Sequence, residues 1–124
     1  MNNTRHLKLA AAYQRELSDL LCYRIKDPRL SGVYITHVVL THDLGLARVY
    51  YNVPEGRVRE QEVKDGFEKS KSFIRREISH RVKIKYTPDL VFYYDDREEI
   101  TEGIDQLFEK IARQKDEPGK KNNV

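Results

Sequence analysis

Residues 33 to 53, "VYITHVVLTHDLGLARVYYNV", constrain the fold of this chain more than any other stretch. They hold two runs, 33–42 and 46–53, that are rich in β-branched and aromatic residues, a composition typical of strands. Only the three residues "DLG" separate the two runs. A connection this short allows antiparallel pairing, whereas a parallel crossover needs a dozen or more residues. The sequence therefore predicts a β-hairpin.

Alternation between apolar and polar residues indicates which side chains of this hairpin face a core. In the second run, Ala47, Val49, Tyr51 and Val53 alternate with polar or larger residues. In the first run the phase changes, because Ile35 and then Val38 and Leu40 point inward. A β-bulge near Thr36 and His37 would reconcile the two halves of the strand.

Helical periodicity surrounds the hairpin. Apolar residues three and four apart predict a first helix over 4–26, with Thr4 as its N-cap and "KDPRLSG" as its end. A second helix is predicted from about Arg59 to about Ser79, with a buried stripe formed by Val63, Phe67, Ser70, Ile74 and Ile78. A third strand is expected within 83–96, best defined at Leu90–Tyr94, because Pro88 cannot donate to a strand pairing.

The C-terminal part of the chain predicts a last helix at 97–115, with an apolar stripe, and then a polar, disordered tail at 116–124. The stripe consists of Ile100, Ile104, Leu107, Phe108 and Ile111. The order α-β-β-α-β-α favours one α+β domain over 1–115, with a small sheet backed by helices. A dinucleotide-binding fold is excluded, because the first two strands form a hairpin and no glycine-rich phosphate loop follows a strand.

Composition limits the location of the protein. The chain of 124 residues has a single cysteine, so an internal disulfide is impossible. It contains no apolar run long enough to span a bilayer, and its first residues, "MNNTRHLKLA", lack the apolar segment of a signal peptide. We therefore expect a monomeric protein of the cytoplasm with no membrane partner.

Positive charge is concentrated in one stretch. Residues 69–86, "KSKSFIRREISHRVKIKY", hold seven basic residues and one acidic residue, in a chain with a net charge of +3. A basic stretch on a folded domain is the footprint expected for a phosphate backbone, because each neutralised phosphate releases a counterion. Most charged runs, however, are only solvated helix faces, so charge alone leaves both interpretations open.

No pattern of catalytic or metal-binding residues is present. None of the four histidines stands at a metal-ligand spacing from another histidine or from Cys22. No serine lies in a nucleophile elbow. The acidic residues at 95–99 are better explained as a helix N-terminus, where the helix dipole favours negative charge. We expect no catalytic residue, no metal and no cofactor, and we expect that the protein is not an enzyme.

Four motifs, taken together, resemble the ribosome-binding factor A family. They are "IKDPRLSG" after the first helix, "THDLGLARVYYNV" in the hairpin, "FIRREI" late in the second helix and "TPDLVFYYDD" entering the third strand. The similarity runs from about Arg5 to Ile111. Each motif is weak alone, but their order and spacing agree with the family.

The resemblance implies a KH-like domain of the second type, α-β-β-α(kinked)-β with a C-terminal helix, in which a three-stranded sheet is backed by helices. It implies an assembly factor that binds the immature small (30S) ribosomal subunit and its rRNA, assists late rRNA maturation and matters for growth in the cold. Ribosomal proteins are further expected partners. In this family an Ala-X-Gly kink in the second helix replaces the GXXG loop of ordinary KH domains, and Ser70, Lys71 and Ser72 occupy the matching positions.

From the charge and the resemblance together we predict an RNA-binding surface. Its residues are Lys69, Lys71, Ser72, Arg75, Arg76, Arg81, Lys83 and Lys85, extended by Arg29 and Arg48. Two alternatives remain open. One is a generic KH-like module for messenger or small RNA, and the other is a protein-interaction module that docks through the acidic last helix, with Asp105 and Glu109.

Overall fold

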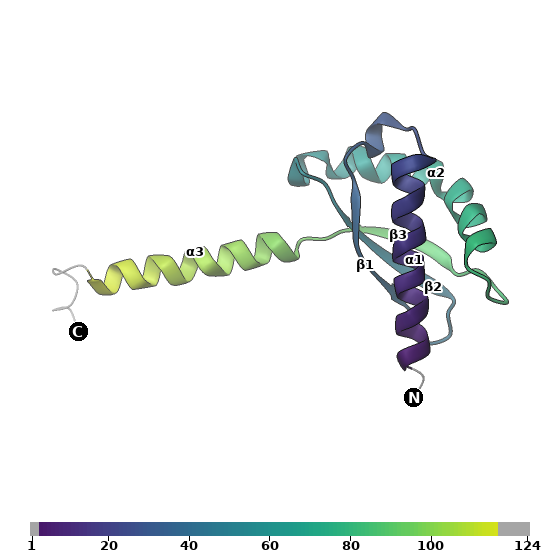
Figure 1. Ribbon diagram of the computed structural model, residues 1–124. Coiled ribbons are helices and arrows are strands. Elements are labelled where there is room, and N and C mark those ends of the chain that lie inside the picture. The colour runs from purple at the N-terminus through teal and green to yellow at the C-terminus, as the bar shows by residue number, and fades with distance from the viewer. Residues whose placement is uncertain (1–2, 117–124) are drawn as a thin grey trace.

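The structure is a computed structural model that describes residues 3–116. Its elements, in chain order, are α1 (Asn3–Tyr23), η1 (Pro28–Leu30), β1 (Tyr34–Leu40), β2 (Leu46–Asn52), η2 (Gly56–Arg59), α2 (Glu60–Arg81), β3 (Asp89–Tyr94) and α3 (Arg97–Asp116). The strands form one sheet in the order β1-β2-β3, and α1 and α2 pack on it while α3 projects away (Figure 1). The predicted α+β architecture is confirmed.

The predicted hairpin and its bulge are both present. β1 pairs antiparallel with β2, and the register shifts between Ile35 and His37, which leaves Thr36 as the extra residue. Gln14 of α1 donates from Nε2 to the Thr36 carbonyl at 3.1 Å, so the carbonyl of the bulged residue has a hydrogen-bond partner outside the sheet. In the turn, Leu44 rather than Gly45 takes a positive φ, of 60°. β3 joins the other side of β2 in parallel.

The two faces of the sheet differ in burial. One face is packed against α1 and α2 and carries the core side chains of all three strands: Ile35, Val38, Leu40, Ala47, Val49, Tyr51, Leu90 and Phe92. Residues that alternate with these, such as Val39, Arg48 and Tyr93, are exposed on the opposite face. We call that second face the open face of the sheet.

Two helix boundaries differ from the predictions. α1 begins at Asn3 and includes Thr4, so Thr4 is not an N-cap. α1 also ends at Tyr23 rather than at residue 26, and a 3₁₀ turn follows at Pro28–Leu30. Asp27 caps that turn in an extended conformation, as expected for a residue before proline, and its carboxylate accepts from the Arg29 backbone N–H at 2.9 Å.

α2 is a single helix from Glu60 to Arg81, and its axis changes direction between its first and second halves (Figure 1). Val63, Phe67, Ile74 and Ile78 are buried, as the stripe predicted, whereas Ser70 is half-buried. Ser72 is exposed. The assignment of the bend to Ser70, Lys71 and Ser72 stays a prediction.

The C-terminal elements differ more from expectation. β3 begins only at Asp89, so Lys83 and Lys85 lie in an irregular connection and not in a strand. The apolar stripe of α3 is exposed, with 42% to 64% of each side chain accessible, so only α1 and α2 back the sheet. Asp116 ends α3, and the rest of the predicted tail, 117–124, lies outside the described residues.

Gly66 lets α2 approach η1 closely. A Cβ atom at this position would lie 2.9 Å from Cδ2 of Leu30 and 3.1 Å from Cβ of Arg29. The first distance is shorter than a normal contact between carbon atoms, and Leu30 is itself buried in the core. A side chain larger than hydrogen at residue 66 would therefore displace Leu30.

We expect Gly66→Ala to lower the free energy of unfolding by about 1 kcal/mol. Overpacking costs about 1–3 kcal/mol, and the better helix propensity of alanine returns about 1 kcal/mol. In a Leu30→Ala background the clash is relieved, and the same change should be neutral or stabilising. Urea unfolding of the four proteins measures this coupling. An equal effect of Gly66→Ala in both backgrounds would contradict the close packing.

Candidate nucleic-acid interface

A shallow groove lies where the second half of α2 meets the connection to β3. It has a volume of about 410 Å³ and is lined by Ser72, Arg75, Arg76, Ser79, Lys85, Tyr86 and Thr87. We call it the α2–β3 groove. Ser72, Arg75, Arg76 and Lys85 among them belong to the predicted RNA-binding set. The helix and the irregular connection thus bring part of that set together.

Arg75 builds one wall of the groove. Its Nη2 donates to the carbonyl of Thr87 at 2.8 Å, its Nε donates to the carbonyl of Pro88 at 3.3 Å, and its guanidinium lies 3.5 Å from the Asp89 carboxylate. These contacts fix the connection against α2. Arg75 therefore shapes the groove, and only part of its donor capacity remains for a ligand.

Arg76 and Lys85 are the available cations of the groove. The guanidinium of Arg76 lies 5.7 Å from the ring centre of Phe73, and the ammonium of Lys85 lies 5.6 Å from the ring centre of Tyr86. Tyr86 is 76% exposed. Within residues 3–116, no carboxylate forms an ion pair with either cation, so both are available to bind an anionic ligand.

Lys69, Lys71 and Lys83 do not line the groove, and they make no ion pair with any residue that the structure describes. Lys69 and Lys83 are exposed, whereas Lys71 is half-buried. The charge of Lys69 instead acts on Asp27, whose pKa it helps Arg29 to lower.

Arg81 and Arg29 are held by carboxylates of their own domain. Nη1 of Arg81 lies 3.2 Å from the Glu16 carboxylate and 2.7 Å from the Asp19 carboxylate, and these pairs join α2 to α1. Arg29 donates to both carboxylate oxygens of Asp27, which lowers the pKa of Asp27 to about 2. Their role as RNA contacts stays a prediction that the geometry does not favour.

Arg48 does not join the groove. It points from β2 to the open face, because its neighbours Ala47 and Val49 are buried on the other face. It is exposed and, among the residues described, it forms no ion pair. The predicted extension of the basic surface through Arg48 would therefore have to reach across the sheet.

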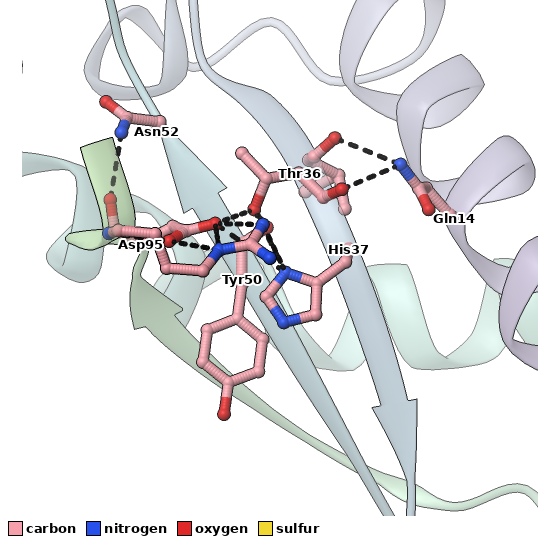
Figure 2. Close-up of polar contacts among 8 residues, drawn as sticks. Gln14, Thr36, His37, Tyr50, Asn52 and Asp95 are labelled. Atoms are coloured by element: carbon pink, nitrogen blue, oxygen red, sulfur yellow. Dashed lines mark hydrogen bonds and ion pairs between the residues drawn. The ribbon is translucent and has the colours of Figure 1, made fainter. Parts of the chain in front are cut away.

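The sequence did not predict a polar cluster that lies at the end of β3. Asp95 is only 5% exposed, and its carboxylate accepts from the Thr36 hydroxyl at 2.5 Å and from Nη2 of Arg97 at 2.8 Å (Figure 2). Its backbone carbonyl accepts from Nδ2 of Asn52 at 2.9 Å. Chiefly the Arg97 side chain, then the Thr36 hydroxyl, hold the pKa of Asp95 well below its usual range.

His37 also belongs to this cluster, with its Nδ1 3.6 Å from the Asp95 carboxylate. Its Nδ1 accepts from Nη2 of Arg97 at 3.1 Å, which places the ring proton on Nε2. Burial and the charge of Arg97 lower the pKa of His37. The ring stacks on Tyr50 of the neighbouring strand (Figure 2). The hydrogen bonds of this cluster thus connect the bulge of β1 to the start of α3.

No group of three or more histidine, cysteine or acidic side chains within 3–116 is placed to hold a metal ion. None of the helices in that range combines the length and apolar character needed to cross a membrane.

Comparisons with known proteins agree with the fold. Residues 5–108 match the family model described as ribosome-binding factor A. Ribosome-binding factor A of Pediococcus pentosaceus is 38% identical over 107 residues, which cover 86% of this chain and 92% of that protein. The crystal structure of ribosome-binding factor A from Thermus thermophilus superposes with a TM-score of 0.65 at 20% identity and covers 72% of this chain and 93% of that one.

A second Thermus thermophilus structure is described as a homology model of the same factor fitted into a cryo-electron microscopy map of its complex with the 30S subunit. It superposes with a TM-score of 0.59 at 21% identity and covers 69% of this chain and 90% of that chain. At this identity the likeness shows a shared fold.

Proposed function

The chain belongs to the ribosome-binding factor A family, and from this premise we propose that it binds the small ribosomal subunit as an assembly factor. The Thermus thermophilus homologue is described in a complex with the 30S subunit, and the same fold makes the same partner the natural proposal here. The ligand on the subunit is ribosomal RNA, because RNA presents a continuous surface of phosphates.

One observation carries the RNA assignment: the α2–β3 groove offers two cations, Arg76 and Lys85, without carboxylate partners among the described residues. Most arginines of the domain pair with acidic side chains, so the unpaired guanidinium of Arg76 is an exception among them, whereas no lysine of the described residues forms an ion pair. Arginine and lysine bind phosphate oxygens, and an exposed aromatic ring can stack on a base.

The proposed mechanism is occupancy. The protein binds rRNA of the immature 30S subunit, holds it in a premature arrangement and so assists the late steps of its maturation. No catalytic residue is required for this role. Such a factor would matter most in the cold, when non-productive RNA structures persist, and would act as a monomer in the cytoplasm.

A generic module for messenger or small RNA is less well supported. Ordinary KH domains grip single strands with a GXXG loop between two helices. The sequence has no GXXG, and the matching region lies within the single helix α2.

The exposed stripe of α3 favours a second contact on the same subunit. Ile104 and Phe108 are 48% and 64% exposed, and Asp105 and Glu109 carry negative charge beside them. A basic ribosomal protein with an apolar groove would complement both features. This contact would survive the loss of the groove cations, which distinguishes it from RNA binding.

Sedimentation of the purified protein with small subunits tests the proposal. We expect co-migration with immature 30S particles at low salt and its loss as salt rises, because phosphate contacts release counterions. Mature 30S particles and large subunits serve as controls. Absence from immature particles at low salt would contradict the proposed function.

A further inference from the structure

Three rings stand in a row across the open face of the sheet, one from each strand. His37 of β1 stacks on Tyr50 of β2 with ring centres 4.1 Å apart and planes inclined by 5°. Tyr50 stacks on Tyr93 of β3 at 5.4 Å and 27°. We call these three rings the aromatic row; Figure 2 shows its His37 and Tyr50 end.

The strand order fixes which ring faces are free. β2 lies between β1 and β3, so Tyr50 has a neighbour on each side and both of its ring faces are covered. The rings at the two ends each keep one face that the row does not cover. Tyr93 is 39% exposed, and it belongs to β3, which is an edge strand. Its outer face is therefore open to a flat ligand.

The row is held in place before any ligand arrives. Arg97 donates to Nδ1 of His37 and is itself bound by the buried Asp95 carboxylate, so the His37 ring cannot turn freely. Strand pairing sets Tyr50 directly opposite both His37 and Tyr93. A preorganised stack costs little conformational entropy when another ring extends it.

Charge on the open face complements a phosphate. Arg48 is exposed without an ion-pair partner among the described residues, and it lies on β2 opposite Val91, one diagonal step from Tyr93. Because Arg48 and Tyr93 stand on the same face of neighbouring strands and two residues out of register, the long side chain of Arg48 can extend toward the Tyr93 ring. A flat ring face beside a free cation matches a nucleotide, whose base stacks while its phosphate pairs.

The row and the proposed RNA contact lie at opposite ends of β3. Lys85, Tyr86 and Thr87 of the α2–β3 groove come directly before β3, and Tyr93 is the fifth residue of that strand. At about 3.3 Å per residue, Asp89 and Tyr93 are about 13 Å apart along the strand. A single strand of RNA would have to be several nucleotides long to contact both.

We propose that the aromatic row is a stacking site for an unpaired RNA base, with Tyr93 as the stacking ring and Arg48 as the phosphate contact. This inference rests on the proposed RNA-binding function and adds a base contact to it. Stacking accepts any base, so the site would recognise single-stranded character and not sequence.

Fluorescence anisotropy with two labelled RNAs tests the site. One is a single-stranded octanucleotide, and the other has the same length and charge but abasic central positions. We expect the wild-type protein to prefer the first RNA by about 5- to 150-fold, the range of one base–aromatic stack. Tyr93→Leu should reduce this preference by the share of one stack and leave the affinity for the abasic RNA unchanged; a stack on Tyr86 would remain.

Two matched variants complete the design. Tyr93→Phe keeps the ring and should retain the preference, and Tyr23→Leu makes the same change at an exposed tyrosine of α1. Equal affinity of the wild type for both RNAs, or a preference that Tyr93→Leu leaves undiminished, would overturn the inference. An effect of Tyr93→Leu on thermal stability alone would assign the row to packing and also overturn it. A failure of the proposed function would be seen in a different experiment, because the wild-type protein would then not sediment with small subunits.

Discussion

Phe67→Ala is expected to lower the free energy of unfolding by about 3–5 kcal/mol, the usual cost of removing a buried phenylalanine. Phe67 is 1% exposed and stacks on Phe92 with ring centres 4.1 Å apart and planes inclined by 7°. Its centre is also 5.2 Å from that of Tyr51. One side chain of α2 thus packs on both β2 and β3, and its loss leaves a cavity between helix and sheet. Equilibrium unfolding in urea measures the change.

Phe108→Ala is the matched control. It removes the same ring from α3, where the side chain is 64% exposed, so we expect a change within about 0.5 kcal/mol. A loss below about 1 kcal/mol for Phe67→Ala would contradict the packing of α2 on the sheet. A large loss for Phe108→Ala would show that α3 packs on the domain in solution.

Arg76→Glu combined with Lys85→Glu is expected to weaken binding to immature small subunits by about 100-fold or more. Hydrogen bonds to charged groups contribute about 1.5 kcal/mol or more each, and the new carboxylates add repulsion. The slope of log affinity against log salt should fall by about 1.4–1.8, because two phosphate contacts are lost. Sedimentation or anisotropy across a salt series measures both quantities.

Folding should be unaffected by this double variant, since neither cation has an ion pair among the residues described. Arg75 is left intact because it donates to the carbonyls of Thr87 and Pro88. Arg5→Glu combined with Lys8→Glu makes the same change in net charge at exposed positions of α1. Equal weakening by both pairs would show that binding follows net charge and would remove the α2–β3 groove from the proposal.

Local patterns predicted the local structure well. Alternation of residue type located the hairpin and even the bulge at Thr36, because a bulge shifts the phase of the pattern within one strand. The end of α1 was misplaced by three residues, at 26 instead of Tyr23. Pro28 predicts that the helix ends before it. It does not predict how many residues before the proline the last helical turn ends.

Long-range pairing was not predictable from these patterns. Arg81 was predicted to contact RNA from the charge of its stretch and the family resemblance, and neither shows that Glu16 and Asp19, far earlier in the chain, bind its guanidinium. The aromatic row was missed for the same reason. Alternation places Tyr50 and Tyr93 on one face of their strands, but only the parallel register of β2 and β3 makes them neighbours.

The prediction that 97–115 is a helix was correct, and the prediction that this helix backs the sheet was wrong. An apolar stripe predicts that a helix face will be covered, and it carries no information on what covers it. Here the stripe faces no element of the domain, as the exposure of every side chain from 97 to 114 shows. The same pattern that marks a core-packing helix in α2 marks an unpartnered one in α3.

Among the described residues, contacts between α3 and the rest of the domain lie in its first turn, where Glu99 accepts from the Tyr94 hydroxyl at 3.0 Å and pairs with Arg57 at 3.1 Å. Beyond that turn, the helix depends on its own backbone hydrogen bonds, whereas most helical stability in proteins comes from the packing of an apolar face. We therefore expect α3 to melt and reform without disturbing the sheet. When a partner covers its stripe, the entropy of ordering the helix is subtracted from the affinity of that contact, so α3 is suited to an attachment that is specific and easily released.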